Sequence, residues 1–319
     1  MADLPASRVT PASRPFVYCG IDYAGPFNIR ESKRKGNIPI TKAYVAVFIC
    51  LKVKAVHLEL VSNLTIEAFM AAFRRFCARR GSSMHVYSDN GTNLVGAANE
   101  LKEVYELLQQ NEQTIALDCA TQNIHWHFIP PRSPHFGGLW EAAVKSVKRH
   151  LKIIMKNLHY TYEEYYTTIV EIEGILNSRP LTALSADPND FAPLTPAHFL
   201  IGESLKRPVE VNYLEIKDNH LSRWQHIQKL RQDFWQRWHK EYLQQLQTRT
   251  RWKNGDYTVQ KGDLVLLIED ALPPLQWKLG RVEDLHPGDD GLVRVVTIRT
   301  TTGIYKRAVK KICALPFKD

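Results

Sequence analysis

The first part of the chain alternates short apolar runs with polar segments, a pattern typical of strands. Runs at 16–22, 85–88 and 124–129 each predict one strand, and the β-branched runs at 43–51 and 55–61 lie close enough to form a hairpin. Helical patterns separate the later strands. This order predicts a mixed α/β layer with an antiparallel hairpin on one side and a parallel part on the other.

Apolar residues spaced three to four apart predict helices between and after these strands. The first begins after the N-cap residue Thr65 and stops at Gly81. Further helices are expected over 97–108, from about 139 to 157, and over 162–177. The last of these stops before a proline, which excludes helical geometry from the residue that precedes it.

Glycine and proline mark two predicted breaks in the regular secondary structure. Gly25 and Pro26 interrupt the first apolar run, so we expect the first strand to end there. The segment 130–138 carries proline at its start and glycine at its end, which predicts a loop. Glu141 would then lie in the first turn of the helix that follows this loop.

The last third of the chain changes character. A long polar helix is expected over 220–248. The near-helical spacing of Trp224, Trp235 and Trp238 favours packing of these side chains against a neighbouring element over the alternative, stacking on DNA. The block 262–316 contains short β runs separated by turn residues, which indicates a small β-barrel.

These patterns divide the chain into four parts. The Pro- and Ser-rich segment 1–15 is an extended lead-in, 16–205 is an α/β core, 206–258 is a helical linker, and 259–319 is the β-barrel.

Composition narrows the class of partner. The net charge is +9 and the sequence pI is about 9.2, which favours a polyanion, either nucleic acid or an anionic membrane surface. The five cysteines never stand as C-x-x-C, which argues against a disulfide framework or a cysteine zinc site and fits a reducing compartment. No apolar stretch approaches the roughly 20 residues of a membrane span, and no secretory signal core is present.

Three carboxylates lie beside loops at the ends of predicted elements: Asp22, Asp89 and Glu141. Converging carboxylates repel one another unless divalent cations are bound between them. Mg²⁺ takes a few carboxylate oxygens and keeps positions for water and phosphate, and a pair of such ions suits an in-line displacement at phosphorus. Each residue alone is better explained as a turn residue or a first-turn helix acid. The three together, in this order, favour a metal site.

A row of lysines follows Glu141. Lys145, Lys148 and Lys152 come four, seven and eleven residues after it, which places all of them on one helix face. This face suits the guidance of a DNA backbone into the site. The simpler alternative is a solvated charged face with a weak Glu141–Lys145 pair. A neighbouring apolar stripe is predicted at Val144, Val147, Leu151 and Ile154.

Seven segments of the chain resemble the integrases of long-terminal-repeat retrotransposons, most closely those of the BEL/Pao class. They are GIDYAGPF (20–27), YSDNGTNLVGA (87–97), PPRSPHFGGLWEAAVKSVKRHL (130–151), LNSRPLT (176–182), LTPAHFLIG (194–202), KGDLVLLIED (261–270) and PLQWKLGRV (274–282). The resemblance covers almost the whole chain.

The resemblance implies a ribonuclease H-like catalytic core, a C-terminal SH3-like β-barrel, and two Mg²⁺ or Mn²⁺ ions held by Asp22, Asp89 and Glu141. It implies DNA strand transfer by attack of a 3′-hydroxyl on a target phosphodiester, together with endonucleolytic 3′-end processing. The partners it implies are element ends and target DNA, further copies of the chain, and chromatin proteins in the nucleus. The residues that it adds as DNA contacts around the site are Asn90, Asn93, Ser133 and His135.

Two departures from the family pattern stand out. The 51 residues between Asp89 and Glu141 exceed the spacing typical of retroviral integrases, and long surface connections are tolerated at little cost. The N-terminal His-His-Cys-Cys zinc domain of such integrases has no counterpart in this sequence, so no zinc is expected. We therefore expect this chain to be a fragment of a longer polyprotein, or a truncated or domesticated copy of such an integrase.

Other polar residues have weaker interpretations. Arg307 and Lys310 make the terminal barrel basic, which suits sequence-independent phosphate contact. His125 and His127 alternate with Trp126 and would share one strand face, where a core or surface role is favoured over metal binding.

Three functions stay open at the level of sequence. The first is a strand-transferring integrase, the second is a catalytically silent DNA- or chromatin-binding protein derived from one, and the third is a nuclease of the same fold. The presence of Asp22, Asp89 and Glu141 favours an enzyme, since a silent binder would be free to lose them.

Overall fold

The computed structural model describes most of the chain. The described residues are 14–32, 38–89, 110–113, 115, 124–129, 134–155, 160–185, 187–206, 210–248, 259–269 and 272–315. At 89, 128–129 and 134–143 the description covers the backbone alone. The helix predicted over 97–108 and the predicted DNA contacts Asn90, Asn93 and Ser133 lie outside these residues.

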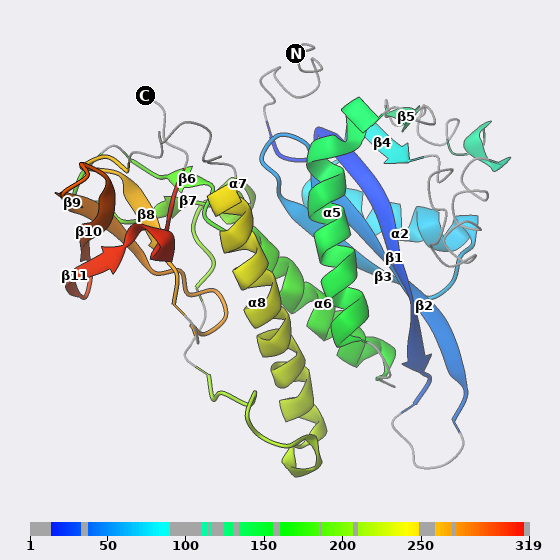
Figure 1. The fold of residues 1–319 in the computed structure, drawn as a ribbon. Coiled ribbons are helices and arrows are strands. Elements are labelled where there is room, and N and C mark those ends of the chain that lie inside the picture. The colour runs from blue at the N-terminus through cyan, green and yellow to red at the C-terminus, as the bar shows by residue number, and fades with distance from the viewer. Residues whose placement is uncertain are drawn as a thin grey trace.

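A five-stranded sheet forms the centre of the larger half of the molecule (Figure 1). Its strands are β1 (Tyr18–Arg30), β2 (Ile40–Cys50), β3 (Val56–Val61), β4 (His85–Asp89) and β5 (His125–Ile129), in the order β3-β2-β1-β4-β5. β1, β2 and β3 are antiparallel, whereas β4 and β5 run parallel to β1. The predicted mixed sheet is confirmed, and its order and directions are those of a ribonuclease H-like sheet.

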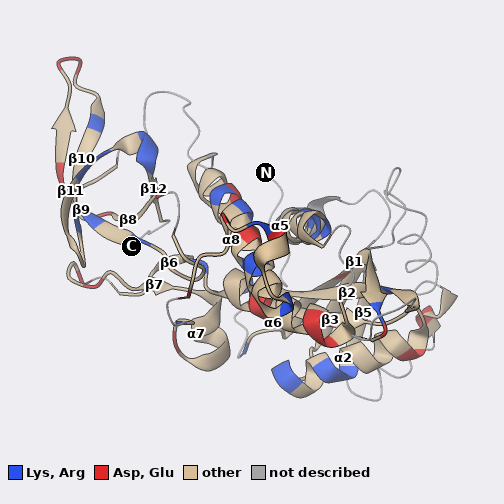
Figure 2. Ribbon diagram, turned by 90° about the horizontal axis from the view of Figure 1, so that it is seen from below, with Lys and Arg blue, Asp and Glu red and all other residues tan. Residues whose placement is uncertain are grey.

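Helices cover both faces of this sheet. α2 (Ile66–Arg80) packs its phenylalanines on one face, and α5 (Pro134–Ile154), α6 (Tyr162–Asn177) and α8 (Arg223–Thr248) lie on the other (Figure 2). Alternate residues of each strand enter the two cores, as the period of two requires. The predicted N-cap is present, because the Thr65 hydroxyl accepts the Ala68 N–H at 3.2 Å.

The first strand does not end at Gly25 and Pro26, so that prediction is wrong. β1 continues to Arg30, and its pairing with β2 shifts register between Ala24 and Phe27, which is a β-bulge. Proline is tolerated at a bulge. A side chain at Gly25 would come within 2.9 Å of the Tyr44 ring, so only glycine fits there. The bulge leaves Ala24 and Phe27 in the same core, that of α5, α6 and α8.

The predicted loop at 130–138 is shorter than expected. α5 begins at Pro134, so Gly137 and Gly138 are helical and Glu141 does not lie in the first turn. Proline suits the start of a helix because its missing N–H would have no helical acceptor there. Each glycine costs about 1 kcal/mol in a helix interior, a cost that tertiary packing can exceed. His135 is consequently a helical residue.

A second sheet follows the long helix. Before this helix, between α6 and α8, lie β6 (Thr182–Ala183), β7 (Pro193–Leu194), α7 (Pro196–Ile201) and the 3₁₀ turn η1 (Asp218–His220). The sheet itself contains β8 (Leu264–Leu267), β9 (Leu279–Pro287), β10 (Val293–Thr300), β11 (Gly303–Ala308), the 3₁₀ turn η2 (Val309–Lys311) and β12 (Ile312–Ala314).

All pairs in this second sheet are antiparallel, in the order β11-β10-β9-β8-β12. The short β runs expected over 262–316 are confirmed. Closure into an SH3-like barrel stays a prediction.

The tryptophans of α8 behave in two ways. Trp235 and Trp238 are buried in the core shared with α5 and α6, and both ring systems contact Trp277 of the second half edge to face. Packing is confirmed for these two. It is not confirmed for Trp224, which is 54% exposed in the first turn of α8 and is not part of that core.

No helix in the described part of the chain has the length and apolar content needed to cross a membrane.

Candidate metal site at the centre of the mixed sheet

Parallel pairing brings the first two predicted carboxylate positions side by side. β1 and β4 pair in register from Tyr18 and His85 to Ile21 and Ser88. Asp22 and Asp89 each follow by one residue, and both still belong to their strands. Neighbouring strands lie about 4.8 Å apart, and paired residues of a parallel sheet share a face. The backbone therefore places the two aspartates as adjacent positions on one face.

The side chain of Asp22 has two well-defined contacts. Its Oδ1 accepts the N–H of Tyr23 at 2.7 Å, and its Oδ2 lies 2.5 Å from Nζ of Lys148. Lys148 comes from α5, which covers this face of the sheet. The Asp22 side chain is 19% exposed, so solvent and ions reach it.

The third predicted carboxylate lies on the same helix. Glu141 precedes Lys148 by seven residues, which is two helical turns and about 10 Å along the axis on the same helix face. The side chains of Asp89 and Glu141 lie outside the description. Among the side chains that the structure describes, no three His, Cys, Asp or Glu are grouped to hold a metal.

The lysine row of α5 divides into two kinds. Lys145 and Lys152 are exposed, whereas Lys148 is partly buried against Asp22. The predicted apolar stripe beside the row is confirmed, because all four of its residues are buried in the core: Val144, Val147, Leu151 and Ile154. Figure 2 shows the basic residues along α5 and α8. The DNA contacts assigned to the lysines stay predictions.

The two basic residues predicted for the C-terminal half lie at the end of its sheet. Arg307 lies over the Tyr305 ring at 5.2 Å and 3.6 Å from Glu269, so part of its charge is already compensated. Lys310 is exposed in η2.

A stack of histidine and tyrosine rings lies across β1, β4 and β5, and the sequence patterns missed it. His85 is the in-register partner of His125, and its Nδ1 lies 3.0 Å from Nε2 of His127. Tyr18 stacks on His85, and Tyr87 stacks on His127. Burial first, and the neighbouring histidines second, lower the pKa of His85 and His127. The neutral form of both rings is therefore favoured.

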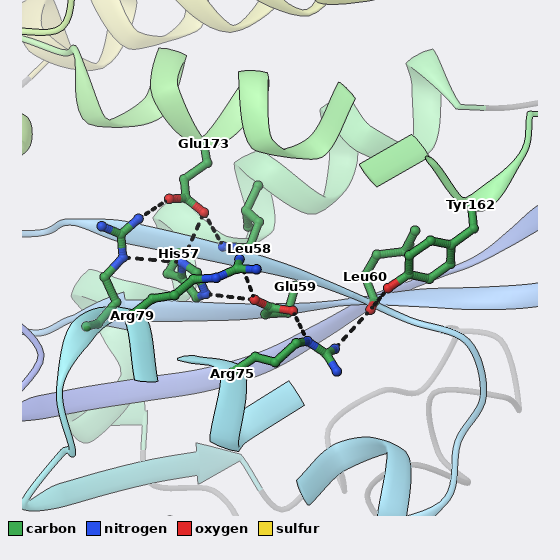
Figure 3. A network of polar contacts seen from close by, with 9 residues as sticks. His57, Leu58, Glu59, Leu60, Arg75, Arg79, Tyr162 and Glu173 are labelled. Carbon is green, nitrogen blue, oxygen red and sulfur yellow. Dashed lines mark hydrogen bonds and ion pairs between the residues drawn. The ribbon is translucent and has the colours of Figure 1, made fainter. Parts of the chain in front are cut away.

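A second carboxylate cluster, also missed from the sequence, surrounds the edge strand β3 (Figure 3). Glu59 is completely buried and lies 2.7 Å from Arg75, 3.0 Å from Arg79 and 3.2 Å from His57. These partners come from α2 and from β3 itself. The carboxylate thus has compensating charge on several sides, as a buried ion requires.

Glu173 extends this cluster from α6. One of its oxygens accepts the backbone N–H of Leu58 at 2.8 Å and lies 3.2 Å from the His57 ring, while the other pairs with Arg80. Four residues later, Asn177 accepts from the N–H of Val56 and donates to its carbonyl, both at 2.8 Å. α6 therefore covers the edge of the sheet, a position that would otherwise invite pairing with another chain.

The LNSRPLT segment (176–182) links several elements through hydrogen bonds. Ser178 accepts the indole N–H of Trp277 at 3.2 Å, and the buried Arg179 donates to the carbonyl of Lys54 in the β2–β3 turn. Asn177, the last residue of α6, bonds to Val56 of β3. Three consecutive residues thus connect the end of α6 to the edge strand, the hairpin turn and the C-terminal half.

The profile of a family of unknown function, DUF5641, matches residues 222–315, which run from the residue before α8 to the residue after β12. The long helix and the second sheet thus fall within one matched unit. No curated protein matches the chain.

Three solved structures are similar to the chain at a low level. The cryo-EM structure of a simian T-cell lymphotropic virus intasome with PP2A regulatory subunit B56 gamma has a TM-score of 0.35 and 12% identity, covering 100% of this chain and 85% of that one. The dimeric form of the HTLV-2 integrase catalytic core domain with magnesium has a TM-score of 0.33 and 17% identity, covering 59% of this chain and 99% of that one. The trimeric form has a TM-score of 0.34 and 16% identity, covering 60% of this chain and 99% of that one. Overlaps this loose carry no argument about activity.

Proposed function

We propose that this chain is a divalent-metal-dependent DNA strand transferase of the BEL/Pao integrase type. The observation that carries the proposal is the parallel register of β1 and β4, which makes Asp22 and Asp89 neighbouring positions on the face that the Glu141 helix covers. Carboxylates are hard oxygen donors, and the Asp22 carboxylate already holds a cationic group at 2.5 Å. This donor set fits Mg²⁺ or Mn²⁺.

Asp22, Asp89 and Glu141 would hold two such ions. When bound, the ions would lower the pKa of an attacking hydroxyl and stabilise charge on the leaving oxygen. In the reaction, the 3′-oxygen of one DNA end loses its proton and forms a new phosphodiester with target DNA. One target phosphodiester breaks, and the target strand leaves with its own 3′-hydroxyl. Endonucleolytic processing of the element end is the same chemistry with water as the nucleophile.

The remaining assignments follow from this function. Lys145 and Lys152 are exposed on the Glu141 face and suit contact with the phosphates of approaching DNA. Arg307 and Lys310 would add phosphate contacts from the C-terminal half, a predicted SH3-like barrel. Asn90, Asn93, Ser133 and His135 would contact DNA around the site. Action on chromosomal DNA implies the nucleus, chromatin proteins as partners, and assembly of several copies of the chain.

The test uses the full chain, an oligonucleotide that mimics an element end, a target plasmid and Mg²⁺ or Mn²⁺. We expect joined products from the wild type and none from Asp89→Asn or Glu141→Gln, with the fold of each variant checked by circular dichroism. Joining by either variant would refute the assigned site.

The same experiment separates the alternatives. A catalytically silent DNA- or chromatin-binding protein would bind DNA equally before and after Asp89→Asn, without Mg²⁺, and would join nothing. A nuclease of the same fold would cut the plasmid in a metal-dependent way without joined products.

A further inference from the structure

Lys148 differs from the other lysines on its helix face. Its Nζ lies 2.5 Å from Oδ2 of Asp22, and the two side chains are 22% and 19% exposed. Lys145 and Lys152, on the same face, are exposed. Lys148 is therefore directed at the sheet, whereas a lysine that only guided DNA would extend into solvent.

The packing of α5 fixes where this ammonium group lies. Val147 and Leu151, on either side of Lys148 in the sequence, are buried in the core beneath the helix. Tyr23 holds the other oxygen of Asp22 through its backbone N–H at 2.7 Å. The orientation of the carboxylate is thus set from two directions, by β1 itself and by α5.

We propose that Lys148 is a positioning residue that acts as the built-in counter-cation of Asp22 and competes with the divalent cation for this carboxylate. The inference rests on the proposed function, because it concerns the metal site assigned there. Two cations that share one carboxylate repel each other. Metal binding therefore requires the ammonium group to move away from Oδ2.

This competition couples metal binding to DNA binding. An ammonium group that has left Asp22 is available to a DNA phosphate beside the site. A phosphate that engages Lys148 in turn leaves Asp22 to the metal. Linkage is reciprocal, so DNA raises the affinity for the divalent cation by the same factor as the cation raises the affinity for DNA.

The test is Mn²⁺ binding to the full chain, measured by the electron paramagnetic resonance signal of free Mn²⁺, first without DNA. Lys148→Met keeps the length of the side chain and removes its charge. We expect it to bind Mn²⁺ more tightly than the wild type by about tenfold, the scale on which groups next to a metal ligand act. Lys152→Met makes the same charge change on the exposed part of the face, eleven residues from Glu141, and we expect wild-type Mn²⁺ affinity from it without DNA.

A second variant distinguishes loss of the charge from a defect in folding. Lys148→Arg keeps the charge at this position, so its Mn²⁺ affinity should stay near that of the wild type. In the second stage, a DNA duplex should raise the Mn²⁺ affinity of the wild type and raise that of Lys148→Met much less.

The possible failures are distinguishable. Equal Mn²⁺ affinity in Lys148→Met and Lys152→Met, or weaker binding in Lys148→Met alone, would overturn the competition while leaving the metal site intact. If the folded wild type and Lys148→Met both bound no Mn²⁺, or bound it unchanged after Asp22→Asn, the metal site of the proposed function would itself be overturned.

Discussion

One sheet carries two carboxylate clusters that differ in nearly every physical respect. Glu59, on the antiparallel edge strand β3, is 0% exposed and paired with Arg75, Arg79 and His57. Asp22, on β1, is 19% exposed and paired with Lys148. β1 lies between an antiparallel neighbour, β2, and a parallel one, β4.

The difference shows how the environment of a carboxylate suits it either to a structural role, as at Glu59, or to the chemistry proposed for Asp22. The cluster at β3 is closed by groups from α2, β3 and α6, so its charge is compensated inside the protein. Burial opposes ionisation of Glu59, but the hydrogen bonds from His57 and Arg75 outweigh burial and lower its pKa. Asp22 on β1 is partly accessible, and Lys148 of α5 pairs with it.

A matched pair of substitutions gives the largest expected effect. Glu59→Gln leaves the buried His57 and its arginines without their counter-charge, and we expect a loss of about 3 kcal/mol in unfolding free energy, the lower end for broken buried pairs. Arg75 and Arg79 are 39% and 44% exposed, which limits the cost. Asp22→Asn should cost under about 1 kcal/mol, as for accessible ion pairs.

The order of the two substitutions should be reversed for DNA-joining activity, where Asp22→Asn should have the larger effect. Per folded molecule, Glu59→Gln should join DNA as the wild type does, and Asp22→Asn should join none. Urea unfolding and the joining assay measure both quantities. The distinction between the two clusters would be wrong if Asp22→Asn proved the more destabilising of the two.

The edge contact of α6 predicts a smaller loss. Asn177→Ala removes the acceptor of the Val56 N–H and the donor to the Val56 carbonyl. Leaving buried polar groups unsatisfied costs about 1–3 kcal/mol, and we expect about 2 kcal/mol from thermal or urea unfolding. Val170→Ala on the exposed part of the same helix is the control, expected within about 0.5 kcal/mol of the wild type. Equal losses in the two variants would contradict the role given to Asn177.

The pH dependence of stability gives the smallest effect. Burial opposes protonation of His57, but hydrogen bonds to Glu173 and Glu59 outweigh burial and raise its pKa. A raised pKa in the folded protein stabilises it fully below the pKa of the unfolded chain, about 6.5. This contribution is lost as the pH rises through the folded value. Unfolding free energies measured between pH 6 and 9 should therefore fall for the wild type and fall less for His57→Gln. An identical slope in both proteins would exclude His57 as the cause.

Local patterns in the sequence were sufficient for most of the elements. The helix over 162–177 was predicted with its observed bounds, and the strands of both sheets were predicted near theirs. The period of hydrophobic residues reports on local geometry and on which face is buried. The errors at Gly25 and Pro134 arose where glycine and proline were interpreted as breaks, although tertiary packing continues the strand and the helix through them.

The sequence by itself determined the candidate chemistry: the carboxylates Asp22, Asp89 and Glu141, a lysine-bearing helix, and motifs that resemble one family. The tertiary structure alone decided which of these groups meet. Pairing of β1 with β4 joins residues 67 positions apart, and it makes Asp22 and Asp89 neighbours. The contact of Lys148 with Asp22, and the pairing of Glu59 with the arginines of α2, likewise depend on how distant elements pack. Hydrophobic periodicity specifies the face of an element, but only burial against a particular partner selects the residue that the face meets.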